Sequence, residues 1–125
     1  MAKGKQRAIR WRDECDAGDY PAALSFLSLI YTRKRAEKIV DALRKTKLTE
    51  FKAKDIFRAS GLSLLGVSNF HVEKDRNKII RGKALSPMLL VRDADNGKVI
   101  IADGYHRLCA VYGFDEDVSI RCKIA

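Results

Sequence analysis

The sequence predicts an α+β fold in which helices from the N-terminal half pack on a small sheet formed by the C-terminal part. Two observations favour this fold. Apolar residues recur at helical spacing up to about residue 80, and short continuous apolar runs replace that pattern after Pro87. With 125 residues, 46% of them hydrophobic, the chain can bury one ordinary core. We therefore expect a single domain over residues 19–125, mainly helical up to residue 82.

Four helices are expected before residue 83. Asp19 marks the start of the first, because its carboxylate can cap free N–H groups and Pro21 fits the first turn. This helix should end near Tyr31. The clearest helix carries an apolar stripe at i, i+3, i+4 and i+7, formed by Ala36, Ile39, Val40 and Leu43. A third helix over residues 51–57 should close at Gly61, and a fourth over residues 69–80 should stop near Gly82.

Strands are expected after Pro87. The apolar runs 88–91 and 99–101 flank an Asn96-Gly97 turn, which predicts two antiparallel strands. Their continuous apolar character indicates burial on both faces. Residues 105–112 should then form a short helix ended by Gly113, and residues 118–124 a last strand.

Residues 1–18 are expected to form a flexible basic arm, because charged residues dominate there. Trp11 is the exception, and we expect it to anchor the arm to the domain. The sequence contains neither a signal peptide nor an apolar run long enough to span a bilayer, so a cytoplasmic protein without membrane contact is expected.

The three cysteines predict neither a disulfide framework nor a metal site. Cys15, Cys109 and Cys122 are odd in number and widely spaced, and two of them stand among apolar residues. We expect reduced thiols that behave as small buried hydrophobic groups.

The formal net charge of +9 is unevenly distributed. Residues 33–58 hold ten Lys and Arg against four acidic residues, whereas residues 59–125 hold ten against eight. A basic surface favours acidic partners such as nucleic acid, although it can also be a solvated helix face. The candidate nucleic-acid contacts are Arg33, Lys34, Arg35 and Lys38.

The residues with the most specific chemical pattern are residues 103–107. Asp103-Gly104 stands between an expected strand and an expected helix, so a helix N-terminus with unpaired N–H groups opens there. Gly104 allows close backbone approach to a ligand, and Arg107 offers a planar fork suited to phosphate oxygens. The His106 ring can donate or accept a hydrogen bond. Alternatively, Asp103 is a helix cap, His106 a packing residue and Arg107 a structural ion-pair partner.

This corner resembles that of the ParB/sulfiredoxin-like superfamily. Residues 100–110, Ile-Ile-Ala-Asp-Gly-Tyr-His-Arg-Leu-Cys-Ala, are similar to the strand–turn–helix signature of ParB-like domains, in which a Gly-Glu-Arg-Arg box contacts the phosphates of CTP. The run is more similar to the Asp-Gly-His-His-Arg type of free serine kinases, which Asp103, Gly104, His106 and Arg107 match. The resemblance covers about residues 85–125 and implies a small mixed ParB-like sheet over residues 83–125.

The resemblance has clear departures. Sulfiredoxins have a catalytic Cys where this chain has Tyr105, so sulfinic-acid reduction is not expected. The second ParB box and a helix-turn-helix are missing, so a chromosome-partitioning clamp is not expected either. Residues 20–60 match no part of the superfamily, and no sequence feature places a further carboxylate, Glu73 or Asp75, at the corner.

Three functions are compatible with these features. The leading hypothesis is a small ParB-like protein that binds a nucleotide or another phosphate ligand; its contact residues are Gly104, Tyr105, His106 and Arg107. CTP or ATP is the expected ligand, with Mg²⁺ carried mainly by the phosphates and no protein metal site. The first alternative is a phosphotransferase or nucleotide hydrolase with Asp103 and His106 as catalytic residues. The second is a DNA- or RNA-associated accessory protein that uses the basic helical segment.

Overall fold

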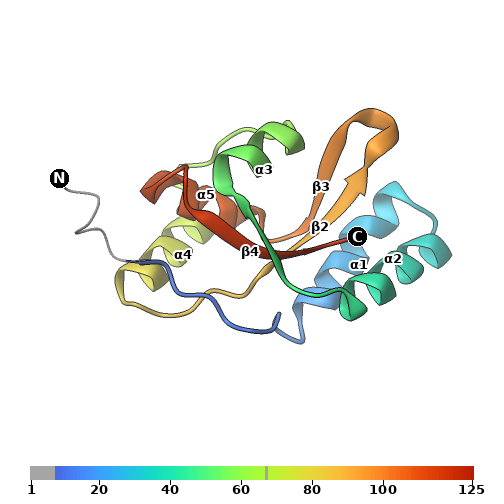
Figure 1. Cartoon of the computed structure of the whole chain (residues 1–125), viewed down its shortest axis with the longest axis horizontal. Helices are drawn as coiled ribbons and strands as arrows, with labels where there is room; N and C mark the ends of the chain where they lie inside the picture. Colours follow the sequence, from blue (N-terminus) through green and yellow to red (C-terminus); the bar gives the residue numbers. More distant parts are fainter. Residues whose placement is uncertain (1–7, 67) are drawn as a thin grey trace.

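The computed structural model describes residues 8–66 and 68–125. In this part of the chain, five α-helices and one four-stranded sheet form an α+β fold, which confirms the predicted fold class (Figure 1). Helices α1 and α2 lie together at one end, and α3, α4 and α5 gather toward the other (Figure 1).

The sheet is mixed and has the strand order β1-β4-β2-β3. Its strands are β1 (Thr49–Lys52), β2 (Met88–Asp93), β3 (Lys98–Asp103) and β4 (Ser119–Ile124). β2 pairs antiparallel with β3, as the sequence predicts, and parallel with β4, while β1 pairs antiparallel with β4. Mixed pairing follows because β4 returns beside β2 only after the chain has passed through α5 (Tyr105–Phe114).

Strand β1 was not expected, since the sequence pattern favours a helix that includes Phe51. In the structure Phe51 pairs with Ile120 of β4, and the helix α3 (Ala53–Ser60) begins two residues later. Pairing with a strand far along the sequence decides the conformation here, because β-propensity depends strongly on the neighbouring strand. The expected closure of α3 is confirmed, since Gly61 adopts the left-handed conformation with φ of 68°.

Both faces of the sheet are covered. Leu89 and Val91 of β2 join a cluster with α1 (Asp19–Ile30) and α2 (Arg33–Lys45), whereas Met88 and Leu90 join a cluster with α3, α4 (Phe70–Ile80) and α5. The alternation follows from the two-residue period of a strand. The predicted burial on both faces is therefore confirmed for β2, whereas Val99 and Ile100 of β3 are only half-buried.

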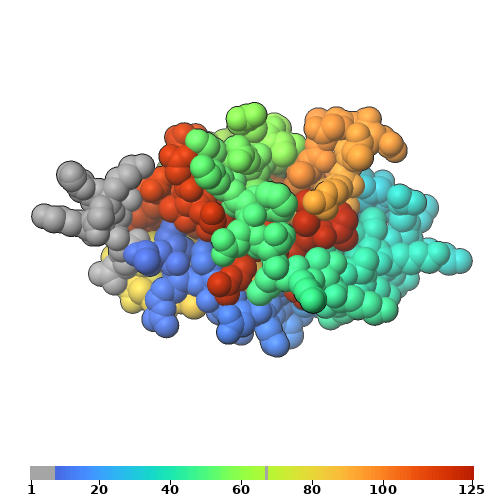
Figure 2. Space-filling view, in the orientation of Figure 1, coloured from blue at the N-terminus to red at the C-terminus, as the bar shows by residue number. Residues whose placement is uncertain are grey.

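Helix α2 confirms the predicted apolar stripe. Ala36, Val40 and Leu43 are buried and Ile39 is half-buried, all in the cluster shared with α1. The helix begins after Thr32, whose side chain accepts a hydrogen bond from the Arg35 N–H at 3.3 Å. Its basic residues are exposed, and together with α1 it forms one end of the elongated surface (Figure 2).

Helix α5 is longer than expected. It continues through Gly113 to Phe114, and the N–H of Asp115 bonds the Val111 carbonyl at 3.0 Å. Gly113 does not end the helix. Glycine is tolerated inside a helix at a modest cost, and only a residue that needs positive φ requires it at the end.

Residues 8–18 lie against the body of the protein, although the sequence predicts a flexible arm there. Trp11 forms a parallel bridge with Leu85, and the Arg12 N–H bonds the Leu85 carbonyl at 2.8 Å. Cys15 is buried. The expected anchoring role of Trp11 is thus confirmed, and the first seven residues of the predicted arm lie outside the described residues.

Within residues 8–66 and 68–125, no helix combines the length and the apolar character that crossing a membrane requires.

Leu43→Ala should lower the free energy of unfolding by about 2–4 kcal/mol, because the fully buried side chain leaves a cavity in the α1–α2 cluster. Leu29→Ala makes the same chemical change at a side chain that is 86% exposed and should change stability by less than about 0.5 kcal/mol. Urea unfolding of both variants measures the difference. Equal effects would contradict the packing of α2 on the sheet.

Candidate functional site

A sharp turn at Gly104 joins strand β3 to helix α5. Gly104 has a φ of 108°, in the left-handed region that favours glycine. A Cβ atom at this position would lie 2.8 Å from the Met88 side chain and 2.9 Å from Arg107 Nη2. The pairing of β2 with β3 is also irregular here, where Leu89 faces Asp103. The turn therefore requires glycine for both its backbone angle and the space beside Arg107.

The N-terminus of α5 presents free backbone donors. Its first helical hydrogen bond runs from the Leu108 N–H to the Gly104 carbonyl at 2.9 Å, and Gly104 supplies no side-chain cap. The N–H groups of Tyr105, His106 and Arg107 precede that bond and have no backbone acceptor within the described residues. This end of α5 is the helix N-terminus without a side-chain cap that the sequence predicts after Asp103-Gly104.

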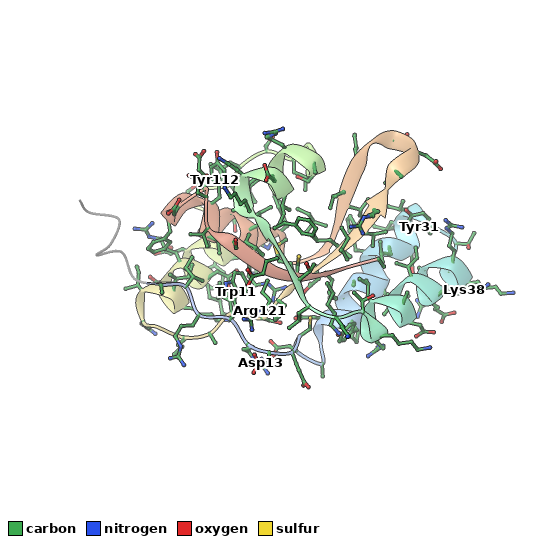
Figure 3. The ribbon with its side chains drawn as sticks, in the orientation of Figure 1. Trp11, Asp13, Tyr31, Lys38, Tyr112 and Arg121 are labelled. Atoms are coloured by element: carbon green, nitrogen blue, oxygen red, sulfur yellow. The ribbon has the colours of Figure 1, made fainter. Side chains whose placement is uncertain are left out.

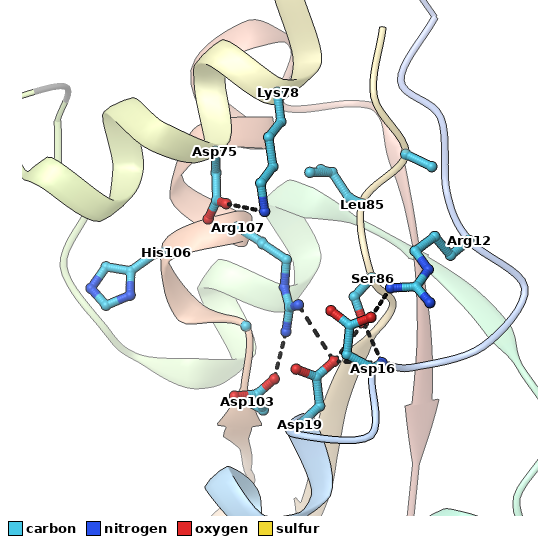
Figure 4. A pocket seen from close by; sticks show the side chains of 12 residues that line it. Arg12, Asp16, Asp19, Asp75, Lys78, Leu85, Ser86, Asp103, His106 and Arg107 are labelled. Atoms are coloured by element: carbon cyan, nitrogen blue, oxygen red, sulfur yellow. Dashed lines mark hydrogen bonds and ion pairs between the residues drawn. The ribbon is translucent and has the colours of Figure 1, made fainter. Parts of the chain in front are cut away.

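The Arg107 guanidinium lies between two carboxylates. Nη2 donates to Asp103 Oδ2 at 2.6 Å, and Nη1 lies 3.6 Å from Asp19 Oδ2 (Figure 4). The side chain is only 13% exposed. Its Nε atom is buried and has no hydrogen-bond partner within the described residues. Of the alternatives open for Arg107, a structural ion pair is therefore present, and its buried Nε donor is left without a partner in the described part of the chain.

Asp19 does not cap helix α1, contrary to the sequence prediction. The N-cap is Gly18, which makes no side-chain cap hydrogen bond. The Asp19 carboxylate instead accepts hydrogen bonds from the Ser86 hydroxyl at 2.5 Å and from the Asp16 N–H at 3.2 Å. It thus connects the start of α1 to the segment before β2 and to Arg107.

These residues border a pocket of about 250 Å³. Its lining residues are Arg12, Asp16, Asp19, Asp75, Lys78, Ala84, Leu85, Ser86, Asp103, Gly104, His106 and Arg107. Four carboxylates and three permanent cations meet there, and all of them are in ion pairs: Arg12 with Asp16, Lys78 with Asp75 at 4.0 Å, and Arg107 with Asp103 and Asp19 (Figure 4). The pocket is therefore polar and close to balanced in charge.

Burial makes two of these carboxyl groups weaker acids. Desolvation raises the pKa of Asp103 to about 6, an effect that nearby Asp19 reinforces and the Arg107 charge opposes. Desolvation also raises the pKa of Asp75, against the opposing charges of Lys78 and Arg107. A carboxyl group that titrates near pH 6 can exchange a proton close to neutral pH.

His106 points away from the Arg107 guanidinium (Figure 4). Its ring lies 4.8 Å from the His71 ring and 5.7 Å from the Tyr105 ring. Burial, and then the neighbouring His71, lower the pKa of His106. The Tyr105 hydroxyl donates to the Ser63 carbonyl, so this side chain holds the loop before α4. The structure brings Gly104, His106 and Arg107 to the pocket, while the Tyr105 side chain lies outside its lining.

The basic residues of α2 lie elsewhere. Arg33, Lys34, Arg35 and Lys38 are exposed, and none of them lines the pocket. Arg33 lies 3.6 Å from Glu37, and the Arg35 guanidinium lies 5.3 Å from the centre of the Tyr31 ring. Lys38 extends from α2 into solvent (Figure 3).

Sequence reasoning missed several pocket residues. Asp19 and Ser86 approach residues 103–107 only through tertiary folding. No sequence feature places Asp75 at the corner, and the structure locates it opposite Arg107 on α4 (Figure 4). Its position on the helix was a usable signal, because Asp75 lies between the buried residues Val72 and Ile79 on the inward side.

In residues 8–66 and 68–125, no cluster of three or more His, Cys, Asp or Glu side chains could hold a metal ion.

Asp103→Asn should change the pH dependence of stability. The folded protein raises the pKa of Asp103 to about 6, so its stabilising contribution is fully present below about pH 3.8 and is lost as the pH rises through 6. Asparagine lacks this titration. Relative to the wild type, the variant should gain about 1–2 kcal/mol in free energy of unfolding between about pH 4.5 and 7.5. Urea unfolding at both pH values measures this, and a constant difference would contradict the raised pKa.

Comparison of the chain with protein-family models, with curated proteins and with solved structures finds no match. The resemblance to the ParB/sulfiredoxin-like superfamily therefore rests on the sequence of about residues 85–125 alone.

Proposed function

We propose that the protein binds the phosphate group of a nucleotide or of another phosphorylated ligand at the Asp103–Arg107 turn. The observation that carries the proposal is the N-terminus of α5, where uncapped backbone N–H groups open beside the buried and unpartnered Nε of Arg107. Backbone donors at a positive helix end and an Arg fork are a common combination for phosphate. The resemblance to ParB-like domains supports the same residues as phosphate contacts.

The size of the pocket supports a phosphate group as the part that is bound. A volume of about 250 Å³ is smaller than most pockets that enclose a whole small molecule. The phosphate end would occupy the pocket, and the remainder of the ligand would extend past its rim. CTP and ATP remain the proposed nucleotides, with Mg²⁺ carried by their phosphates.

The carboxylates set a condition for anion binding. Asp103 and Asp19 already neutralise Arg107, so an incoming phosphate must compete with them or bind when one is protonated. Because the pKa of Asp103 lies at about 6, its protonation requires little free energy near neutral pH. We propose that phosphate binding is accompanied by proton uptake at Asp103.

A thermal-shift screen with CTP, ATP, ADP and GTP, each with and without Mg²⁺, tests the proposal. A ligand at one hundred times its dissociation constant stabilises the folded protein by about 2.7 kcal/mol. Calorimetric titration with the selected nucleotide should then show binding about tenfold or more weaker for Arg107→Lys, because lysine keeps the charge between the carboxylates but loses the fork.

Arg121→Lys is the matched control, since Arg121 forms an exposed ion pair with Asp13 at 3.0 Å, away from the pocket. Circular dichroism and urea unfolding establish that both variants are folded before their affinities are compared. Equal nucleotide affinity in wild type, Arg107→Lys and Arg121→Lys would remove the turn as the binding site, and no stabilisation by any nucleotide would argue against the ligand class.

A second candidate function is phosphotransfer or nucleotide hydrolysis at the same turn. The pKa of Asp103, about 6, favours this function because a general base works best when it titrates near the working pH. This candidate requires Asp103 to remain ionised in the nucleotide complex, in place of the proton uptake proposed for binding alone. His106, whose pKa burial lowers, would be neutral at pH 7 and could also accept a proton.

If Asp103 is the base, Asp103→Asn should lower ATP turnover, measured alone and with serine, by about 100-fold or more while calorimetry shows nucleotide binding retained. His106→Gln provides the comparison at the neighbouring candidate. Unchanged turnover in Asp103→Asn, or no turnover by the wild type with either acceptor, would reject this candidate and leave binding as the function.

A further inference from the structure

Helix α4 presents an exposed face on which one aromatic side chain adjoins several cations. Phe70, Lys74, Asn77 and Arg81 follow one another at i, i+4, i+7 and i+11, so they line one side of the helix. With Glu73, Lys78 and Lys83 they border a hollow of about 460 Å³. Four cations and one carboxylate line this hollow, which makes it distinctly basic.

Phe70 is unusual in its exposure. Its side chain is 71% exposed, more than any other aromatic side chain in the described residues, with Phe26 at 42% and Phe51 at 37%. One side of the ring meets His71, with ring centres 5.5 Å apart and the planes nearly perpendicular. The opposite side lacks a ring partner within the part of the chain that the structure describes. An exposed aromatic face beside cations is suited to a planar anionic ligand.

Two cations on this face are also exposed and unpaired within the described residues, so they can contact an anionic ligand. Lys74 and Arg81 are exposed and form no ion pair within residues 8–66 and 68–125. On the basic helix α2, Arg33 pairs with Glu37 and Arg35 lies over Tyr31, whereas Lys34 and Lys38 are exposed. Seven residues separate Lys74 from Arg81, or about 10 Å along a helix, so the two cations can contact different phosphates of one strand.

We propose that this face of α4 binds single-stranded nucleic acid, with an unpaired base stacked on Phe70 and the backbone phosphates on Lys74 and Arg81. Stacking on exposed aromatic side chains beside a basic track is the usual chemistry of single-strand binding. Paired bases in a duplex are stacked on each other and cannot stack on Phe70 in this way. The proposal is independent of the phosphate site at Gly104.

An anionic membrane surface fits this face less well. A helix that lies on a membrane inserts a broad apolar face, and the apolar face of α4, including Val72 and Ile79, is already buried in the core. Among the large apolar side chains of α4, only Phe70 and Ile80 remain exposed, at 71% and 44%. The combination of one exposed ring and several cations favours a nucleic-acid strand.

Fluorescence anisotropy of the full chain with labelled oligothymidylate and oligouridylate of about 15 nucleotides tests the proposal. Lys74→Glu/Arg81→Glu should weaken binding about tenfold or more at low salt and reduce the slope of log affinity against log salt by about 1.4. Lys34→Glu/Lys38→Glu makes the same change in net charge on α2 and should weaken binding much less.

A second pair of variants tests the stacking contact with Phe70. Phe70→Leu should weaken binding about 5- to 100-fold, because leucine keeps an apolar side chain but removes the stacking surface. Phe26→Leu, at the next most exposed aromatic ring, should leave the affinity within about twofold. Circular dichroism and urea unfolding establish that all four variants are folded, as expected for exposed positions.

Several outcomes would overturn the proposal. If the wild type binds neither oligonucleotide at low salt, or if the α4 and α2 charge variants lose equal affinity, the proposal is wrong. Equal affinity for a duplex, with no effect of Phe70→Leu, would contradict the stacking of an unpaired base. Phe70-dependent binding to phosphatidylserine vesicles, without binding to oligonucleotides, would identify a membrane surface as the partner. Selective loss of single-strand binding in the α4 variants supports it.

Discussion

The position of Arg107 between Asp103 and Asp19 joins the two parts of the chain at the pocket. Asp103 ends strand β3, Arg107 lies in the first turn of α5, and Asp19 begins α1. All three side chains are largely buried, so each charge depends on the others for compensation. Removal of one member of a buried ion pair typically costs about 3–5 kcal/mol, because it leaves an uncompensated charge in a poorly hydrated environment. The orientation of α1 is therefore linked to the same side chain that faces the pocket.

This ion-pair cluster limits what the pocket can do. At about 4 Å and an effective dielectric constant of about 20, a pair of unit charges interacts by about 4 kcal/mol. A monovalent anion would gain little by displacing a carboxylate from Arg107. A phosphate dianion brings more charge and can also reach the N–H groups of α5, and a proton on Asp103 would weaken its competitor. For the proposed function, this arrangement would favour a phosphate dianion over a monovalent anion and would make binding depend on the protonation of Asp103.

Local patterns in the sequence predicted what is local in the structure. The α2 stripe, the left-handed Gly61 and the turn at Gly104 depend on neighbouring residues, and all three were expected. Strand β1 and the role of Asp19 were not, since each is decided by a distant partner. The Asp19–Ser86 hydrogen bond spans 67 residues, and no spacing rule connects them. A carboxylate beside a helix start is usually a cap, and here the tertiary ion pair takes its place.

Charge illustrates the same limit of sequence reasoning. A count over residues 59–125 gives almost as many acidic as basic side chains, so the segment does not stand out as a binding surface. The count gives every charge equal weight. In the folded chain Asp75 and Asp103 lie inside the pocket, with 14% and 20% of their side chains exposed, whereas Lys74 and Arg81 face outward. Because buried carboxylates are paired and contribute little to the field outside, the outer face of α4 is more basic than its sequence indicates. Only the fold separates the acidic residues that shape the pocket from the cations that remain on the surface.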